Sequence, residues 1–426
     1  MSPVVTTAAK ATEPISMDRI ASADEHECSE DTSRRIVLAA VVFALFADMF
    51  IYESIIPILP RFVARWNVSP AAYGFLFSTF AVAVLFTTPL FGVIADRYGR
   101  RLPLLAGALG LAASTTLIAV ANNFFILFVA RVLQGVSGAA IWTSGMALVA
   151  DLYPRKLRGR AMGTVMTGIS MGTLIGPLLG GALFERVGPR VPFYAGSLLA
   201  WTGFVLLWKT VPRKQLDRMS PTLSPEATPR LWHVALMSIW KRPAFRAVFA
   251  IVALGGMMLC LLEPTLPLHL DRTLGAGPES IGWLFLSATA AYGLFSPLAG
   301  FASDRWSRRS IMAIGLISAA AVLPWIAIPT SWPSLVAVMV LFGISCSLML
   351  TPALPEMADA ADDEASSDYG AAYAWFNMAY AFGMMIGTGA GGWIASLYGL
   401  FAALCVMSAA AIICLPLLIY RKHGAS

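Results

Sequence analysis

Four charged side chains lie well inside long apolar segments of this 426-residue chain, away from the segment ends: Asp48, Glu53, Arg131 and Glu263. A charged side chain at the centre of a lipid bilayer costs about 2.5–3.5 kcal/mol on insertion scales, so each should face a wet cavity or a partner of opposite charge. Acids in such places bind protons or cations. The four residues therefore indicate proton or cation binding inside a membrane.

Asp48 and Glu53 lie five residues apart in one segment, about 140° apart around a helix, so the two acids occupy different faces. We expect one of them to carry protons and the other to have a structural role. The alternative for either residue is a buried acid that hydroxyl groups or an arginine simply satisfy.

Arg131 is the only cation in its apolar segment, and its natural partner is an acid of the same half of the chain. Its helix face continues, at three- and four-residue spacings, through Gln134, Gly135, Gly138 and Trp142. Our hypothesis is that Arg131 pairs with Asp48 or Glu53 and releases that acid when it is protonated. The alternative is a purely structural ion pair.

Glu263 is followed by Pro264, with Pro267 three residues later. Proline interrupts helical hydrogen bonding, so a broken helix could present Glu263 as a cation-binding or second proton-binding acid. The alternative is a glutamate at the helix mouth that faces water.

The elements that must position these side chains are apolar segments. Of all residues, 58% are hydrophobic and 13% charged, with a mean hydropathy of +0.72, which exceeds what a soluble protein can bury. About 20 apolar residues span the bilayer core as a helix, which pairs its own backbone groups. Twelve segments have this length: 36–60, 71–94, 102–121, 124–150, 160–184, 191–210, 245–270, 279–302, 311–330, 333–356, 369–396 and 399–420. The expected fold class is an all-α membrane protein with twelve transmembrane helices.

The twelve segments form two sets of six, which predicts one bundle at 36–210 and another at 245–420. The polar, Pro-containing segment 211–244 is interpreted as a cytoplasmic linker. Residues 1–35 are interpreted as a disordered tail, since they lack the pattern of a secretory signal, and 421–426 as a short C-terminus.

Lys and Arg are unevenly divided between the two sides of the membrane. If both termini and the loops after the second, fourth, sixth and eighth segments share one side, that side carries most of the cations. Positive loops stay in the cytoplasm, so both termini are expected there. Topology then explains the net charge of +6, and we expect no nucleic-acid partner.

The two halves repeat one another. Gly92-Val-Ile-Ala-Asp96-Arg97-Tyr-Gly99-Arg100-Arg101 returns as Gly300-Phe-Ala-Ser-Asp304-Arg305-Trp-Ser307-Arg308-Arg309. Glu53-x-x-x-Pro57 returns as Glu263-x-x-x-Pro267, and a glycine run at 172–181 returns at 383–392. Six helices is an even number, so the halves run in the same direction. This predicts two bundles related by pseudo-two-fold symmetry, with a site between them near the midplane.

These motifs resemble those of the major facilitator superfamily, and the resemblance covers nearly the whole chain after residue 35. Residues 92–101 resemble the family's signature between the second and third helices, and Arg131-Val-Leu-Gln134-Gly135 resembles the fourth-helix motif of its proton-coupled members. Residues 262–267 and 368–374 most resemble the vesicular amine transporter-like branch of the twelve-span drug:proton antiporters. The lysine and the acid that this branch carries are replaced here by Phe80 and Asn377.

The residue types and the resemblance together imply the following roles. The candidates for proton coupling or substrate binding are Asp48, Glu53, Arg131, Gln134, Glu263 and Asn377. The candidates for a conformational latch between the bundles in the outward-open state are Gly92, Asp96, Arg97, Arg100, Arg101, Asp304 and Arg305. The antiporter-type glycine helix has Gly172, Gly176, Pro177, Gly180 and Gly181, for which tight packing is the plainer explanation. Asp359 and Asp362 form a possible proton relay or, alternatively, part of a solvated acidic loop.

We therefore expect a secondary active transporter and not an enzyme: a proton-coupled antiporter that exports a small, partly hydrophobic molecule such as a drug, toxin, secondary metabolite or amine. The proton gradient is its energy source, and no cofactor, metal or nucleic acid is expected. It is expected to act as a monomer in the plasma membrane or an internal vesicle or vacuole membrane. The alternatives are proton-linked or facilitative uptake and, from a different class, a transporter-like membrane sensor.

Overall fold

The computed structural model describes residues 17–66, 68–211, 243–353, 355–357 and 369–416, whose regular elements are all helical. Those of the first half are α1 (Met17–Ile55), α2 (Leu59–Val63), η1 (Ala64–Trp66), α3 (Pro70–Tyr98), α4 (Arg101–Ala119), α5 (Phe124–Leu152), α6 (Arg155–Arg186) and α7 (Val191–Thr210). Those of the second half are α10 (Pro243–Leu274), α11 (Pro278–Arg305), α12 (Arg308–Val322), η2 (Leu323–Ala327), α13 (Trp332–Leu350), α15 (Tyr369–Ile386), η3 (Gly387–Gly391), α16 (Gly392–Tyr398) and α17 (Leu400–Cys414).

Each of the twelve expected segments corresponds to helical structure. Ten described helices are long and apolar enough to cross a membrane. The eleventh segment is divided into α15, the π-helical turn η3 and α16, and the twelfth contains α17. The all-α membrane fold predicted from the sequence is confirmed.

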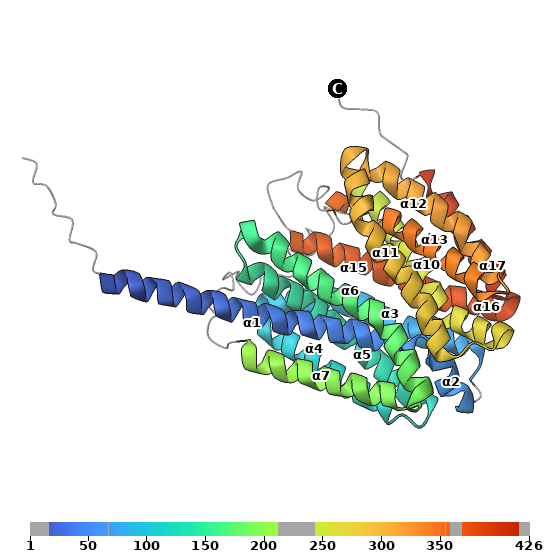
Figure 1. The fold of residues 1–426 in the computed structure, drawn as a ribbon, viewed down its shortest axis with the longest axis horizontal. Coiled ribbons are helices and arrows are strands. Elements are labelled where there is room, and N and C mark those ends of the chain that lie inside the picture. The colour runs from blue at the N-terminus through green and yellow to red at the C-terminus, as the bar shows by residue number, and fades with distance from the viewer. Residues whose placement is uncertain (1–16, 67, 212–242, 354, 358–368, 417–426) are drawn as a thin grey trace, which may run out of the picture.

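The two halves pack in the same way, and they lie side by side in Figure 1. Helix α1 packs on α6 as α10 packs on α15, and α3 packs on α5 as α11 packs on α13. Between the halves, α3 of the first packs on α15 of the second, and α11 of the second packs on α6 of the first. This exchange of equivalent helices is what a pseudo-two-fold axis between two bundles produces. We call them the N-bundle (α1 to α7) and the C-bundle (α10 to α17).

The buried apolar residues form three clusters. One lies wholly in the N-bundle and one wholly in the C-bundle, so each bundle has a core of its own. The third joins residues of α1, α2, α3 and α5 to Cys260 of α10 and Met384 of α15. The contact between the bundles is therefore itself a packed apolar layer, and it surrounds the site described below.

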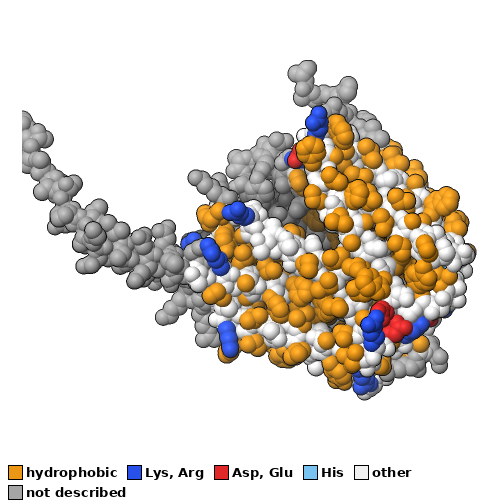
Figure 2. All heavy atoms as spheres, in the orientation of Figure 1, with side chains coloured by type: hydrophobic (Ala, Val, Ile, Leu, Met, Phe, Trp, Pro, Cys, Tyr) orange, Lys and Arg blue, Asp and Glu red, His pale blue; other side chains and the backbone are white. Residues whose placement is uncertain are grey.

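The outer surface is that of a protein surrounded by lipid. Hydrophobic side chains cover most of the face in Figure 2, and the charged side chains gather at its two ends. Large apolar side chains such as Phe86, Leu294 and Ile413 are 70–76% exposed. An exposed apolar surface of this extent marks a membrane or partner interface, and the long apolar helices identify the membrane.

Glycines set the spacing of the helices within each bundle. Along α6, an added Cβ at Gly172 would lie 2.6 Å from the Phe46 carbonyl oxygen, and one at Gly180 would lie 2.5 Å from that of Ser54. Gly176 lies against Glu53 in the same row. The glycine run therefore packs directly on α1, as the plainer explanation of the motif expects. The second run packs in the same way on α10, with Gly387 against Met257.

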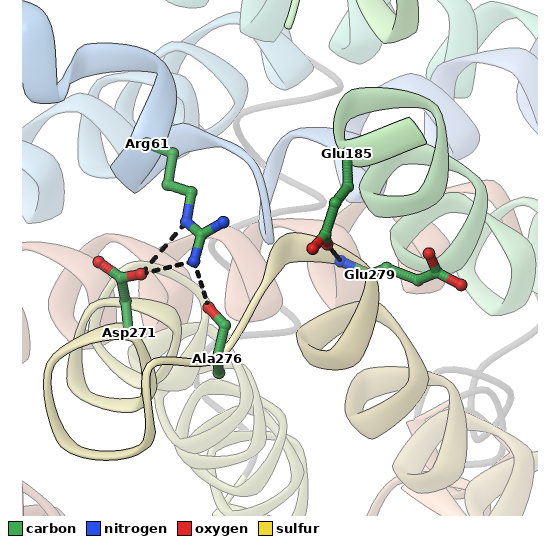
Figure 3. Close-up of polar contacts among 5 residues, drawn as sticks. All are labelled: Arg61, Glu185, Asp271, Ala276 and Glu279. Carbon is green, nitrogen blue, oxygen red and sulfur yellow. Dashed lines mark hydrogen bonds and ion pairs between the residues drawn. The ribbon is translucent and has the colours of Figure 1, made fainter. Parts of the chain in front are cut away.

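One end of the molecule, which we call the Arg61 end, is closed by contacts between the bundles (Figure 3). Arg61 of α2 donates to the Asp271 carboxylate at 3.0 and 3.2 Å and to the Ala276 carbonyl at 3.0 Å. The Glu185 carboxylate of α6 accepts from the backbone N–H of Glu279, whose own carboxylate pairs with Arg186. Exposed ion pairs of this kind contribute little, so they must act together with tighter contacts beneath them.

The tighter contacts are backbone to backbone. An added Cβ at Gly74 of α3 would lie 2.5 Å from the Thr388 carbonyl oxygen and 3.1 Å from the Gly392 Cα. On the other side of the interface, one at Gly282 of α11 would lie 2.5 Å from the Pro177 carbonyl oxygen. Toward the opposite, Asp96 end, Gly163 of α6 and Gly300 of α11 have nothing within 4 Å of such an atom. The bundles therefore close most tightly at the Arg61 end.

The N-terminal tail differs from expectation. Helix α1 begins at Met17 rather than near residue 36, so disorder is the wrong prediction for 17–35 (Figure 1). No proline follows Pro14 before the span, and extending an existing helix carries no new nucleation cost. Residues 1–16, the linker residues 212–242, Asp359, Asp362 and residues 421–426 lie outside the described part of the chain.

We predict opposite effects for two glycine-to-alanine substitutions in α6. Gly180→Ala should destabilise the protein by about 1–3 kcal/mol, because the new methyl group overlaps α1 and forces the helices apart. Gly163→Ala is the matched control: with no neighbour to meet, it should stabilise the helix by about 0.5–1 kcal/mol. Thermal unfolding in detergent measures both. Equal effects of the two substitutions would contradict the packing role of Gly180.

Candidate functional site between the two bundles

The site forms where α1, α5 and α10 meet. Asp48 and Tyr52 lie one turn apart on α1, so they share a face, and that face meets Arg131 and Trp142 of α5. Glu263 of α10 reaches the same place from the C-bundle. Three of the acids and cations singled out in the sequence therefore lie together, each less than a tenth exposed.

Asp48 is only half satisfied. Its Oδ2 accepts a 3.0 Å hydrogen bond from the Trp142 indole N–H, whereas its Oδ1 is buried with no hydrogen-bond partner. Gly138 of α5 leaves room beside the carboxyl group, because an added Cβ there would lie 3.4 Å from Oδ2. The unpartnered oxygen is where a proton would bind.

Arg131 is completely buried and forms no direct ion pair with any residue that the structure describes. Its Nη1 donates to the Gln134 side-chain oxygen at 2.8 Å, while Nε and Nη2 lack hydrogen-bond partners. The hypothesis of a contact with Asp48 or Glu53 is therefore not met here. Asp48 and Glu263 both lie close enough to attract the guanidinium through space.

Three aromatic rings take the place of an ion-pair partner. The guanidinium carbon of Arg131 lies 4.9 Å from the centre of the Phe77 ring and 5.1 Å from those of Phe80 and Tyr52. A cation over an aromatic face gains about 2 kcal/mol or more once it is desolvated. Phe80, one of the two positions at which the sequence departs from the branch it resembles, is thus part of the arginine's support.

Tyr52 joins the two bundles. Its hydroxyl group donates a 2.5 Å hydrogen bond to Glu263 Oε2 across the interface and lies 3.9 Å from the Met384 sulfur. The ring is fixed on the N-bundle side, with its centre 4.6 Å from that of Phe80. A hydrogen bond to a carboxylate is roughly twice as strong as a neutral one.

Helix α10 runs without a break through Pro264 and Pro267, so the interruption expected there is absent. Each proline still lacks an N–H donor, so the carbonyl groups four residues earlier, those of Cys260 and Glu263, lose their helical partners. The rest of the helix keeps its path because it is buried among the other helices of the C-bundle.

Glu53 lies on a different side of α1 from Asp48. Its Cβ packs against Gly176 of α6, and its carboxyl group is close enough to that of Glu263 for the two charges to repel. Among the described residues it has no hydrogen-bond partner. Two acids from opposite bundles thus face one site, and a single positive charge could lie between them.

The remaining candidates divide into two groups. Gln134 belongs to the site through Arg131, whereas Asn377 of α15 is half-buried and makes no contact with the cluster among the described interactions. The latch candidates lie at the Asp96 end, where Asp96 pairs with Arg100, which also contacts Asp151 of α5 at 3.1 Å.

The aspartate of the latch motif is paired more closely with its arginine in the first copy than in the second. In the second copy Asp304 is 76% exposed and lies 4.0 Å from Arg308, and Arg309 pairs instead with Glu356 at 2.7 Å. Gly99 follows the last residue of α3 and has a φ of 83°, a conformation that favours glycine. Ser307 replaces it in the second copy.

The other latch candidates lie toward the ends of helices. Gly92 is buried, and Arg97 and Arg305 lie in the last turns of α3 and α11. The described contacts of both copies stay within one bundle.

Sequence reasoning missed Tyr52, Tyr380 and Cys260 as members of the site. The Cys260 thiol lies 3.7 Å from the Tyr380 hydroxyl oxygen and faces Glu263. The one available signal was the spacing of Tyr52, a polar-tipped residue one turn from Asp48. Cys260 is fully buried.

Comparison with known proteins identifies the family. The Major Facilitator Superfamily model matches residues 41–263 and 248–426, which is most of the chain. The probable vesicular acetylcholine transporter-B of Danio rerio is 32% identical over 373 residues, covering 84% of this chain and 74% of that protein. The chromaffin granule amine transporter of Homo sapiens is 28% identical over 351 residues, covering 82% of this chain and 65% of that protein. The chain thus spans slightly less than two thirds of the human relative.

Solved structures agree on the fold. A bacterial homolog of the human lysosomal transporter Spinster, in an inward-facing and occupied conformation, superposes with a TM-score of 0.76 at 16% identity over 91% of this chain and 96% of that one. The human organic anion transporter TETRAN gives a TM-score of 0.66 at 18% identity, covering 90% and 99%. The chain is therefore a transporter, not an enzyme, and it belongs to the major facilitator superfamily, in its vesicular amine transporter-like branch.

Proposed function

We propose that this protein is a proton-coupled antiporter that exports a small, partly hydrophobic organic cation from the cytoplasm by alternating access. The observation that carries the proposal is the position of Glu263, a buried acid of one bundle that accepts a hydrogen bond from Tyr52 of the other and is attracted through space by its Arg131. A titratable group at the contact between two bundles can bias which end of the transporter opens.

Competition for the acids is the proposed means of coupling. A proton and a cationic substrate each neutralise a carboxylate, so Glu263 and Glu53 cannot hold both at full affinity. Asp48, with one unpartnered oxygen near Arg131, provides a second proton site in the N-bundle. Arg131 keeps the site positive overall when the acids are neutral, which favours release of a bound cation.

The aromatic and acidic surroundings favour an amine or a quaternary ammonium ion as substrate. Tyr52, Phe77 and Phe80 already hold one cation, the Arg131 guanidinium, in a cage of the kind that binds ammonium groups. The relatives are named as amine and acetylcholine transporters, which supports the same class. Drugs, toxins and secondary metabolites that carry such a cation are included in the proposal.

The cation count of the loops supports a topology with the Arg61 end outside and both termini in the cytoplasm. On this topology the structure is the inward-facing form. We propose that the protein works as a monomer, in the plasma membrane or in the membrane of an internal vesicle, with the proton gradient as its only energy source.

Transport into proteoliposomes tests the antiport. The probes are ethidium and acetylcholine, whose charges are permanent, so a pH gradient cannot trap them as it traps weak bases. With an acidic interior, wild-type protein should accumulate at least one probe while the interior becomes alkaline, because protons leave in exchange. Protein-free liposomes are the control.

Three other outcomes would reject this proposal in distinct ways. Equal transport rates with and without a pH gradient would indicate facilitated diffusion. Accumulation only when the exterior is acidic would indicate proton-linked uptake. If neither probe is exchanged for protons or carried along with them, the substrate is not a cation of this class.

We predict that Asp48→Asn abolishes proton-driven accumulation, by at least about tenfold, because an amide cannot carry the proton. Folding should persist, since the asparagine oxygen can still accept the Trp142 hydrogen bond. The measurement is accumulation under the acid-inside gradient, with the unfolding temperature as a check of folding. Unchanged accumulation by a folded Asp48→Asn protein would remove Asp48 from the coupling site.

We predict that Asp96→Ala slows transport several-fold while probe affinity stays within about twofold. Asp96 contacts Arg100 at the Asp96 end, away from the site, so it should act on the change between conformations. Asp304→Ala is the matched control and should have a smaller effect, because Asp304 is mostly exposed and 4.0 Å from Arg308. Initial rates and equilibrium probe binding separate the two effects; a loss of binding would contradict a latch.

A further inference from the structure

We infer that Tyr52 is a lock that keeps the empty transporter from changing conformation, and that it opens only when Glu263 is neutralised by a proton or by a cationic substrate. The inference rests on the proposed function for its transport consequence. Its structural consequence, a pH-dependent opening of the Arg61 end, stands independently of any substrate.

The first step is the position of the hydrogen bond. Tyr52 belongs to α1 of the N-bundle and Glu263 to α10 of the C-bundle, and their 2.5 Å contact crosses the interface. Both side chains are buried, at 3% and 7% exposure. Separation of the bundles at this level must break the contact, and in a buried site water does not replace it at once.

The second step is that the Tyr52 hydroxyl group cannot follow Glu263. The Tyr52 ring packs at a tilt against the Phe80 ring of α3, and the Arg131 guanidinium of α5 lies over its face; both residues belong to the N-bundle. On the other side, Glu263 is carried by α10, which is buried in the core of the C-bundle. The bond therefore joins two rigid bodies rather than two mobile side chains.

The third step concerns charge. An ionised Glu263 accepts the Tyr52 proton in a charge-assisted bond and attracts the Arg131 guanidinium of the N-bundle. When Glu263 is protonated, it no longer attracts the Arg131 guanidinium, and its hydrogen bond to Tyr52 is weaker because it is no longer assisted by charge. A bound ammonium group has the same effect, because it takes over the carboxylate as its own partner.

The described titratable and charged groups that face Glu263 come from four helices. They are Tyr52 and Glu53 of α1, Arg131 of α5, Tyr380 of α15 and Cys260 of α10 itself. Of these, Tyr52 and Arg131 attract the ionised carboxylate from the opposite bundle, and Tyr52 is the one of the two that contacts it directly. Cys260 also contacts the carboxylate, but from the same helix, so it does not join the bundles. Glu53 repels the ionised Glu263 carboxylate, so Glu53 does not help to hold the two bundles together.

The consequence for transport is obligatory exchange. The proton-loaded and the substrate-loaded forms can both change conformation, whereas the empty form, with Glu263 ionised, is held closed at the Arg61 end. An antiporter needs this rule, because an empty carrier that changes conformation would let substrate run down its gradient without protons.

The test measures the opening of the Arg61 end without any substrate. Spin labels on Ala64→Cys and Thr273→Cys, both exposed and in opposite bundles, report the distance between bundles in nanodiscs. Cys28, Cys405 and Cys414 are replaced by serine, while the buried Cys260 and Cys346 stay. Distances are recorded at pH 8.5 and pH 5 for wild type, Tyr52→Phe and the matched control Tyr73→Phe.

Tyr73 is a buried tyrosine whose described hydrogen bond goes to the Pro60 carbonyl within the N-bundle, at 3.3 Å. It lies near Asp271 and Arg272 of the C-bundle, but no hydrogen bond to either is described. Wild type and Tyr73→Phe should be closed at pH 8.5 and open further at pH 5. Tyr52→Phe should raise the open-to-closed ratio at pH 8.5 by about 10- to 100-fold, the range expected for one hydrogen bond to a charged group. At pH 5 the three proteins should be alike.

Two results would overturn the lock. One is a Tyr52→Phe protein that is as closed as Tyr73→Phe at pH 8.5. The other, which decides the matter should Tyr52→Phe fail to fold, is a Glu263→Gln protein that remains closed at both pH values, although its neutral side chain mimics the protonated acid.

A transport readout separates this inference from the proposed function. Downhill ethidium or acetylcholine efflux without a pH gradient should rise about tenfold or more in Tyr52→Phe relative to Tyr73→Phe. If the labels respond as expected but neither probe is transported by wild type, the lock stands and the substrate proposal fails. If wild type exchanges probes for protons and Tyr52→Phe is equally coupled, the antiport stands and the lock fails.

Discussion

The cost of placing charge in a medium of low dielectric constant governs this structure. Arg131 is fully buried, yet within the described part of the chain it has no ion-pair partner in direct contact. Its charge is carried by three aromatic faces, one amide oxygen and the more distant acids Asp48 and Glu263. Because this stabilisation is spread over two bundles, any change in the charge of either acid alters the balance between them.

The structure also requires its helices to approach one another closely, and glycines, which have no side chain, allow this at the contact positions. The glycines of α6 pack on α1, and those of the α15 region pack on α10, so the same device builds both bundles. Gly176 also positions Glu53, because any larger residue would displace the acid from its place opposite Glu263. Packing and function are therefore not separate roles for this motif: the tight contact sets where the acid can be.

Much of the fold and part of the site could be predicted from sequence. Long apolar runs, the internal repeat and the rarity of charge within spans identified the helices and brought attention to Asp48, Arg131 and Glu263. Charge complementarity suggested an ion pair for Arg131, but the rings of Phe77 and Phe80 provide an alternative that apolar spacing does not distinguish from core packing. Tyr52 and Glu263 are more than 200 residues apart in the chain, and their contact depends on how the two bundles meet. No local sequence pattern encodes such a contact. The π-helical turn at Gly387–Gly391 is likewise a tertiary outcome.

The backbone contacts at the Arg61 end have a consequence for permeability. At Gly74 and Gly392 two helices meet with no side chain between them, and the Gly282–Pro177 contact does the same on the opposite side of the interface. A file of water molecules needs a gap of about one molecular diameter lined by polar partners, and such contacts leave neither. The closed end therefore has no room for a line of water molecules at these two contacts. The proposed proton-coupled exchange depends on such a seal, because a leak of protons at the closed end would dissipate the gradient that drives it.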